Sequence, residues 1–92
     1  MEEKPLYKIR ITGRVQGVGF RWSAVREAKS RGITGFVKNQ YDGSVYIEAE
    51  GSQEQLLDYI EWCRSGPGAA LVKSVTADPA PPENYLDFTI EY

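Results

Sequence analysis

The pattern of apolar positions predicts β-strands at five places. Residues 7–15 and 44–50 each alternate apolar and polar side chains, which is typical of a strand with one buried face. Short, mostly apolar stretches at residues 36–39 and 72–77 predict two further strands. Residues 86–92 alternate once more and predict a closing strand, so that the last strand of the chain is split or doubled.

Two segments between these strands have the spacing of helices. Residues 20–31 predict a helix that stops at Gly32, because glycine readily adopts the left-handed conformation that ends helices. Ser52 and Gln55 stand three residues apart as a capping box, and the helix that they open ends before residues 66–68. The residues expected to face the core are Trp22, Val25 and Ala28 in the first helix and Leu56, Ile60 and Cys63 in the second.

The element order is therefore β-α-β-β-α-β, with a hairpin turn at Asp42 and Gly43. Neither a helix nor a sheet can bury its apolar side alone, so both helices must cover one face of the sheet. This predicts an α+β fold, a ferredoxin-like βαββαβ sandwich with an antiparallel sheet of four to five strands. We expect residues 1–92 to form a single domain, a size at which chains fold alone. Many unrelated functions use this fold, so the fold does not choose one.

Composition excludes several kinds of chemistry. The chain has no histidine and one cysteine, so a histidine base, a histidine-ligated metal and an internal disulfide are excluded. We expect no metal and no cofactor. No apolar run has the roughly 20 residues of a membrane span, and the acidic start lacks the features of a signal peptide. We expect a cytoplasmic monomer with no membrane partner.

Charge is divided unevenly along the chain. Residues 4–38 carry nine basic residues and one acid, a net charge of +8, whereas residues 39–92 carry two basic and ten acidic residues, a net charge of −8. A basic half favours an anionic partner, although a solvated basic face is the commoner origin of such clustering.

The most informative stretch is residues 13–21, where a strand ends, a glycine-rich loop follows and a helix begins. Free N–H groups at a helix N-terminus, joined to a loop with glycines at positions 13, 17 and 19, can form a concave anion site. Arg21 lies in the first helical turn, where a cation opposes the helix dipole at a cost of about 0.3–1 kcal/mol. A bound anion would remove that conflict, and an arginine offers phosphate a planar fork. The alternative is a surface arginine packed on Trp22 or Val25.

Asn39 ends the second predicted strand and also has two interpretations. Asparagine is a common turn residue because it tolerates left-handed dihedral angles and caps its own backbone. A carboxamide can also accept from and donate to one water molecule, and so orient a nucleophile, although it cannot take the proton of that water.

At these residues the sequence resembles the acylphosphatase family. Residues 11–21 read ITGRVQGVGFR and match the first signature of that family, and residues 35–39 read GFVKN and begin the second. The second signature continues through Gly43, Ser44, Val45 and Gly51. Both signatures match at every fixed position, and the similarity spans about residues 7 to 92.

The resemblance implies hydrolysis of acyl phosphates to a carboxylate and inorganic phosphate, without metal or cofactor. It places the phosphate-binding arginine of the family on Arg21 and the water-orienting asparagine on Asn39. Gln40 departs from better-known vertebrate members, which often carry threonine there, so this position offers Asn39 a carboxamide in place of a hydroxyl. The backbone amides that the resemblance assigns to the phosphate are those of Val15, Gln16, Gly17, Val18, Gly19 and Phe20.

Other functions remain as alternatives. The basic first half of the chain would suit a ferredoxin-like module that binds nucleic acid. The strand at residues 44–50, however, carries two glutamates where an RNA-binding sheet has basic and aromatic residues. We therefore expect no nucleic-acid partner. A role in handling carbamoyl phosphate, as in the acylphosphatase-like domain of hydrogenase maturation proteins, is a further alternative. We interpret Asp42 as a turn residue, Glu48 and Glu50 as solvated, and Cys63 as core rather than nucleophile. Trp22, Phe36 and Trp62 are interpreted as packing residues.

Overall fold

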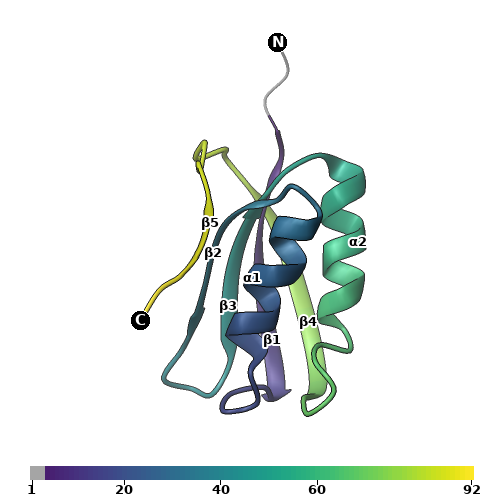
Figure 1. Ribbon diagram of the computed structural model, residues 1–92, viewed down its shortest axis with the longest axis vertical. Helices are drawn as coiled ribbons and strands as arrows, with labels where there is room; N and C mark the ends of the chain where they lie inside the picture. Colours follow the sequence, from purple (N-terminus) through teal and green to yellow (C-terminus); the bar gives the residue numbers. More distant parts are fainter. Residues whose placement is uncertain (1–3) are drawn as a thin grey trace.

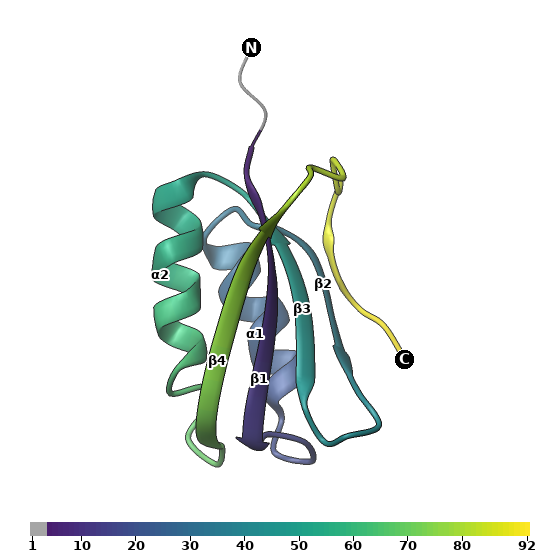
Figure 2. The ribbon, with the colours of Figure 1, turned by 180° about the vertical axis from the view of Figure 1, so that it is seen from behind.

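The computed structural model describes residues 4–92 and arranges them as one sheet with two helices on one of its faces (Figure 1). Seen from behind, the other face of the sheet carries no helix within these residues (Figure 2). The strand order across the sheet is β4-β1-β3-β2-β5. The elements are β1 (Leu6–Arg14), α1 (Phe20–Ser30), β2 (Thr34–Asn39), β3 (Val45–Glu50), α2 (Gln53–Cys63), β4 (Leu71–Ala80) and β5 (Phe88–Ile90).

The ferredoxin-like fold is confirmed, but the sheet is mixed rather than antiparallel. Strands β4, β1, β3 and β2 pair antiparallel in that order, whereas β5 runs parallel to β2. Because β4 ends at the same end of the sheet where β2 begins, the chain can cross that end over residues 81–87 and enter β5 in the direction of β2. The antiparallel prediction was therefore wrong for this one pair.

The closing strand is shorter than the predicted residues 86–92. Only three residues of β5 pair with β2, from Gly35 to Val37, and the amide of Glu91 adds one more hydrogen bond to the carbonyl oxygen of Val37 at 2.9 Å. Leu86 and Tyr92 lie beyond the paired segment and are fully exposed. The last residue, Tyr92, is thus free to lie beside the first turn of α1.

The core lies between the sheet and the helices. Alternating residues of β1 and β3, including Ile9, Ile11, Val45 and Ile47, are fully buried, as the alternation predicts. The predicted core residues of α2 are buried too, and the hydroxyl of Tyr59 donates a 2.8 Å hydrogen bond from α2 to a carbonyl oxygen of α1.

The packing role predicted for Trp22 was wrong. Its side chain is 64% exposed, whereas Phe20, Ala24 and Ala28 face the sheet. Successive helical residues are turned by about 100°, so Trp22 lies about 200° from Phe20 and points away from the core. The guanidinium of Arg26 lies 4.8 Å from the centre of its ring.

The solvated role predicted for Glu50 was also wrong. Glu50 is 3% exposed, and its carboxylate accepts hydrogen bonds from the amides of Glu83, Asn84 and Tyr85 at 2.8–3.1 Å. Glu48, on the same strand, accepts hydrogen bonds from two tyrosine hydroxyls rather than standing alone in solvent. The carboxylate of Glu50 holds the β4–β5 connection, and thereby the position at which β5 begins.

Candidate active site

The loop of residues 15–19 joins β1 to α1 and contains two glycines with left-handed backbones. Gly17 has φ of 73° and Gly19, the N-cap of α1, has φ of 79°. A Cβ added at either position would meet nothing within 4 Å, so glycine is required for its backbone conformation and not for space. The loop therefore presents backbone without a side chain to open space at these two glycines, beside the start of the helix.

The amides of this loop lack protein partners. The first hydrogen bond of α1 runs from the amide of Ser23 to the carbonyl oxygen of Gly19 at 3.1 Å. Among residues 4–92, no backbone or side-chain acceptor takes a hydrogen bond from the amides of Val15 through Phe20. Unpartnered N–H groups at a helix N-terminus favour an anion, because both their dipoles and the helix dipole place positive potential there.

A pocket of about 300 Å³ opens beside these amides and brings together residues that are far apart in the sequence. Arg21 lines it from the first turn of α1, and Asn39 lines it from the end of β2. Ile90 and Tyr92 close it on the side of β5. The structure thus unites in one pocket the two side chains singled out as catalytic and part of the loop expected to bind phosphate.

The guanidinium of Arg21 is free to meet an anion. It lies 5.3 Å from the centre of the Tyr92 ring, and no carboxylate of residues 4–92 forms an ion pair with it. Of the two packing partners considered for Arg21, Trp22 and Val25, the ring of Trp22 lies against the guanidinium of Arg26 instead. Sequence reasoning missed Tyr92 as a site residue, since an aromatic residue in an alternating strand indicates only packing.

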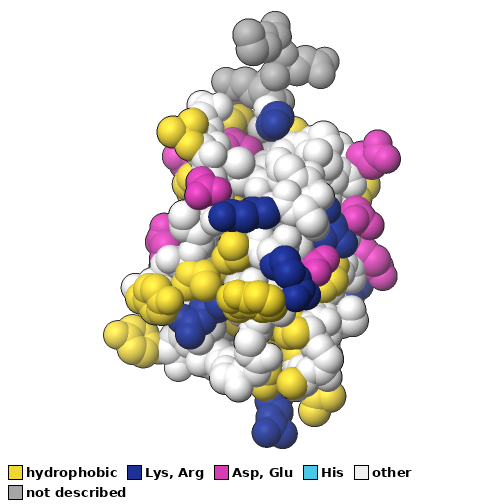
Figure 3. All heavy atoms as spheres, viewed as in Figure 1, with side chains coloured by type: hydrophobic (Ala, Val, Ile, Leu, Met, Phe, Trp, Pro, Cys, Tyr) yellow, Lys and Arg dark blue, Asp and Glu magenta, His cyan; other side chains and the backbone are white. Residues whose placement is uncertain are grey.

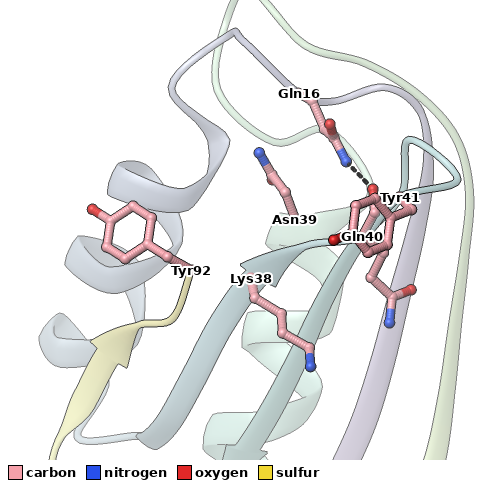
Figure 4. A pocket seen from close by; sticks show the side chains of 6 residues that line it. All are labelled: Gln16, Lys38, Asn39, Gln40, Tyr41 and Tyr92. Carbon is pink, nitrogen blue, oxygen red and sulfur yellow. Dashed lines mark hydrogen bonds between the residues drawn. The ribbon is translucent and has the colours of Figure 1, made fainter.

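Asn39 lines the pocket, and a different residue caps the turn that follows it. Its Oδ1 atom is buried and has no hydrogen-bond partner among the described residues. The turn is capped instead by Asp42, whose Oδ1 accepts a hydrogen bond from the amide of Ser44 at 2.9 Å. In the close view, the side chain of Asn39 points from the end of β2 toward the loop before α1 (Figure 4).

Gln16 connects the loop to the hairpin that follows Asn39. Its Nε2 atom donates to the carbonyl oxygens of Gln40 and Ser44 at 2.8 and 2.9 Å, and the first of these bonds is drawn in Figure 4. The side chain of Gln40 accepts a hydrogen bond from the hydroxyl of Ser44. The sequence analysis named only the backbone amide of Gln16. No local sequence pattern indicates that its side chain binds the hairpin, which lies more than twenty residues away in the chain.

The other titratable candidates lie outside the pocket. Hydrogen bonds from Ser44 and the nearby Arg10 hold the pKa of Asp42 well below its usual range, so this carboxylate is a poor proton carrier. Burial raises the pKa of the Cys63 thiol to about 12, which agrees with a core role. No Asp or Glu lines the pocket among the described residues.

Within residues 4–92 no three potential metal ligands cluster together, and none of the helices there is long and apolar enough to cross a bilayer. The polar side chains that line the pocket belong to Arg21, Asn39 and Tyr92, beside the amides of the loop.

Comparison with known proteins agrees with this arrangement. The acylphosphatase family model matches residues 7–90. An acylphosphatase of Thermotoga maritima is 49% identical over 85 residues, which cover 92% of this chain and 94% of that protein. The crystal structure of acylphosphatase from Bacillus subtilis superposes with a TM-score of 0.93 at 37% identity, covering 96% of this chain and 99% of the other. Full-length HypF matches with a TM-score of 0.89 at 25% identity, but over only 12% of its length. The chain belongs to the acylphosphatase family.

Proposed function

We propose that this acylphosphatase hydrolyses acyl phosphates by holding the phosphate group with the amides of Val15 through Phe20 and the guanidinium of Arg21, while Asn39 orients the attacking water. One observation carries the proposal. Unpartnered loop amides, an arginine that has no carboxylate partner among the described residues, and the carboxamide of Asn39 meet at one pocket.

Phosphate is the anion that this set of donors suits best. At about 4 Å and an effective dielectric constant near 20, each pair of unit charges attracts by roughly 4 kcal/mol before desolvation, so a dianion gains more than a carboxylate. The guanidinium adds a planar pair of N–H donors that matches two phosphate oxygens. Phosphoryl transfer spreads negative charge over the equatorial oxygens, and donors already in place stabilise that charge without reorganisation.

The reaction itself needs little further help. An acyl phosphate is a mixed anhydride, and its carboxylate is a good leaving group. Water attacks phosphorus, the bond between phosphorus and the acyl oxygen breaks, and the carboxylate departs with the bonding electrons. The carboxamide of Asn39 hydrogen-bonds to the water and orients it, and a phosphate oxygen of the substrate takes the proton. This route fits a pocket that no Asp or Glu side chain lines within residues 4–92.

The test is hydrolysis of benzoyl phosphate in the presence of EDTA. We expect activity in the wild type, its loss in Arg21→Gln, and loss of most of it in Arg21→Lys, which keeps the charge but not the fork. Arg14→Gln is the matched control, because Arg14 is an exposed arginine at the start of the same loop but does not line the pocket. Near-native kcat/KM in Arg21→Gln would show that the site is assigned wrongly.

Asn39→Ala separates orientation of water from binding of substrate. Because the carboxamide acts on the water, we expect kcat to fall much more than KM rises. An effect confined to KM would contradict this role. A bell-shaped pH profile whose ascending limb disappears on removal of a single Asp or Glu would show that a carboxyl group, and not the substrate, takes the proton.

A further inference from the structure

We propose that the acyl group of the substrate lies in a groove between α1 and β5 and that the exposed ring of Trp22 gives the enzyme a preference for apolar acyl chains. We call this hollow of about 430 Å³ the α1–β5 groove; Trp22, Val25 and Lys29 line it from α1, and Asp87 and Ile90 line it from β5 and the residue before it. The inference rests on the phosphate site proposed above.

Two hollows formed by the described residues share lining residues with the phosphate pocket. One, of about 590 Å³, shares Asn39 and Tyr92 with it and is the pocket drawn in Figure 4. The other is the α1–β5 groove, which shares Trp22, Ile90 and Tyr92 with it. Asn39 does not line the groove, and Trp22 does not line the pocket of Figure 4. Tyr92 borders all three hollows, whereas Asn39 joins the phosphate pocket to the first hollow alone and Trp22 and Ile90 join it to the groove alone.

The geometry of phosphoryl transfer selects between them. The attacking and leaving oxygens lie roughly in line on opposite sides of phosphorus. With the water at Asn39, the acyl oxygen must point away from Asn39. Of the two hollows, only the α1–β5 groove is not lined by Asn39, and it meets the phosphate pocket at Trp22 and Ile90. The acyl chain accordingly extends along the ring of Trp22.

The groove is suited to an uncharged chain. The ring of Trp22 is 64% exposed and takes no part in the core, and Val25 and Ile90 add apolar surface beside it. The two cations that line the groove each have a carboxylate near them, Lys29 with Asp87 at 3.7 Å and Arg26 with Glu27 at 3.3 Å. Figure 3 shows hydrophobic side chains gathered on this face, with Lys and Arg side chains among them.

A homologous series of substrates tests the proposal. For acetyl, butanoyl and hexanoyl phosphate, kcat/KM should rise about two- to fourfold for each methylene that enters the groove. In Trp22→Ala this rise should disappear or become slight, while Trp22→Phe should keep part of it. Tyr41→Ala and Leu86→Ala are matched controls, because both residues are exposed and neither lines the groove. Both controls should keep the wild-type rise.

The outcomes separate this inference from the function on which it rests. A wild type that hydrolyses all three substrates at equal kcat/KM, or a Trp22→Ala variant with an unchanged rise, overturns the acyl site and leaves the phosphate site standing. A rise lost in Tyr41→Ala instead places the acyl chain on the side of Asn39. Succinyl phosphate used as well as butanoyl phosphate overturns the preference for uncharged chains. A wild type that hydrolyses none of them overturns the proposed function as well.

Discussion

Replacing Glu50 tests the contact that holds the β4–β5 connection. The Glu50 carboxylate accepts hydrogen bonds from three consecutive amides, two at Oε2 and one at Oε1. Glutamine has nearly the same shape but only one acceptor oxygen. If the glutamine oxygen takes the place of Oε2, Glu50→Gln keeps the two hydrogen bonds made there. Its NH₂ group then faces the N–H of Tyr85, so two donors meet and the third hydrogen bond is lost.

The expected loss follows from these bonds. A hydrogen bond to a charged group contributes about 1.5–3 kcal/mol, so Glu50→Gln should lower the free energy of unfolding by about that amount. Glu50→Leu removes all three acceptors. An N–H group left without a partner costs about 1–3 kcal/mol, and the lower value applies here because part of this connection is open to water. With three such groups, the free energy of unfolding of the leucine variant should fall by about 3 kcal/mol or more.

Urea unfolding followed by tryptophan fluorescence measures both losses. Glu83→Gln is the control, since Glu83 is exposed in the same connection and forms no ion pair among the described residues; it should stay within about 0.5 kcal/mol of the wild type. A Glu50→Gln variant as stable as the control would show that the buried carboxylate contributes nothing beyond filling its site.

Three further predictions follow from individual contacts. Gln16→Leu removes the two hydrogen bonds that join the phosphate loop to the β2–β3 hairpin, so we expect kcat on benzoyl phosphate to fall, with retained stability toward urea excluding a general loss of fold. Burial raises the pKa of the Cys63 thiol to about 12, so a thiol reagent at about pH 8 should label it only after unfolding; rapid labelling of the folded protein would contradict its burial. Burial and hydrogen bonding to Glu48 raise the pKa of Tyr46 and of Tyr85. The stability that these two protonated hydroxyls contribute is therefore present below about pH 10, the pKa of tyrosine in the unfolded chain, and is lost as the pH rises further. Urea titrations from about pH 9 to 11 should show the free energy of unfolding fall, and Glu48→Gln should make that fall smaller.

The sequence predicts the fold well because local patterns and the pairing of layers agree. The alternation in β1 and β3, the capping box at Ser52 and the stop at Gly32 each follow from neighbouring residues, and all are found. The direction of β5 depends instead on where the chain crosses the end of the sheet, and no local pattern of apolar residues encodes that.

The residues of the candidate site were predicted where a local sequence pattern indicates them, and they were missed where the site depends on contacts between distant segments. Glycines before a helix and an arginine in its first turn are visible in the sequence and predict an anion site. The ring of Tyr92 beside Arg21, and the bridge from Gln16 to the hairpin, exist only because the fold brings separate segments together. Glu50 was misread for the same reason, since its partners lie more than thirty residues away in the chain.

The central claim is that loop amides and one guanidinium bind a phosphate group. Titration of the ¹⁵N-labelled protein with inorganic phosphate, followed by amide NMR, tests it most directly. We expect the amides of Val15 through Phe20 to shift together in a saturable manner, and the same shifts to be absent in Arg21→Gln. Shifts that centre on another basic surface while these six amides stay unchanged would contradict the account.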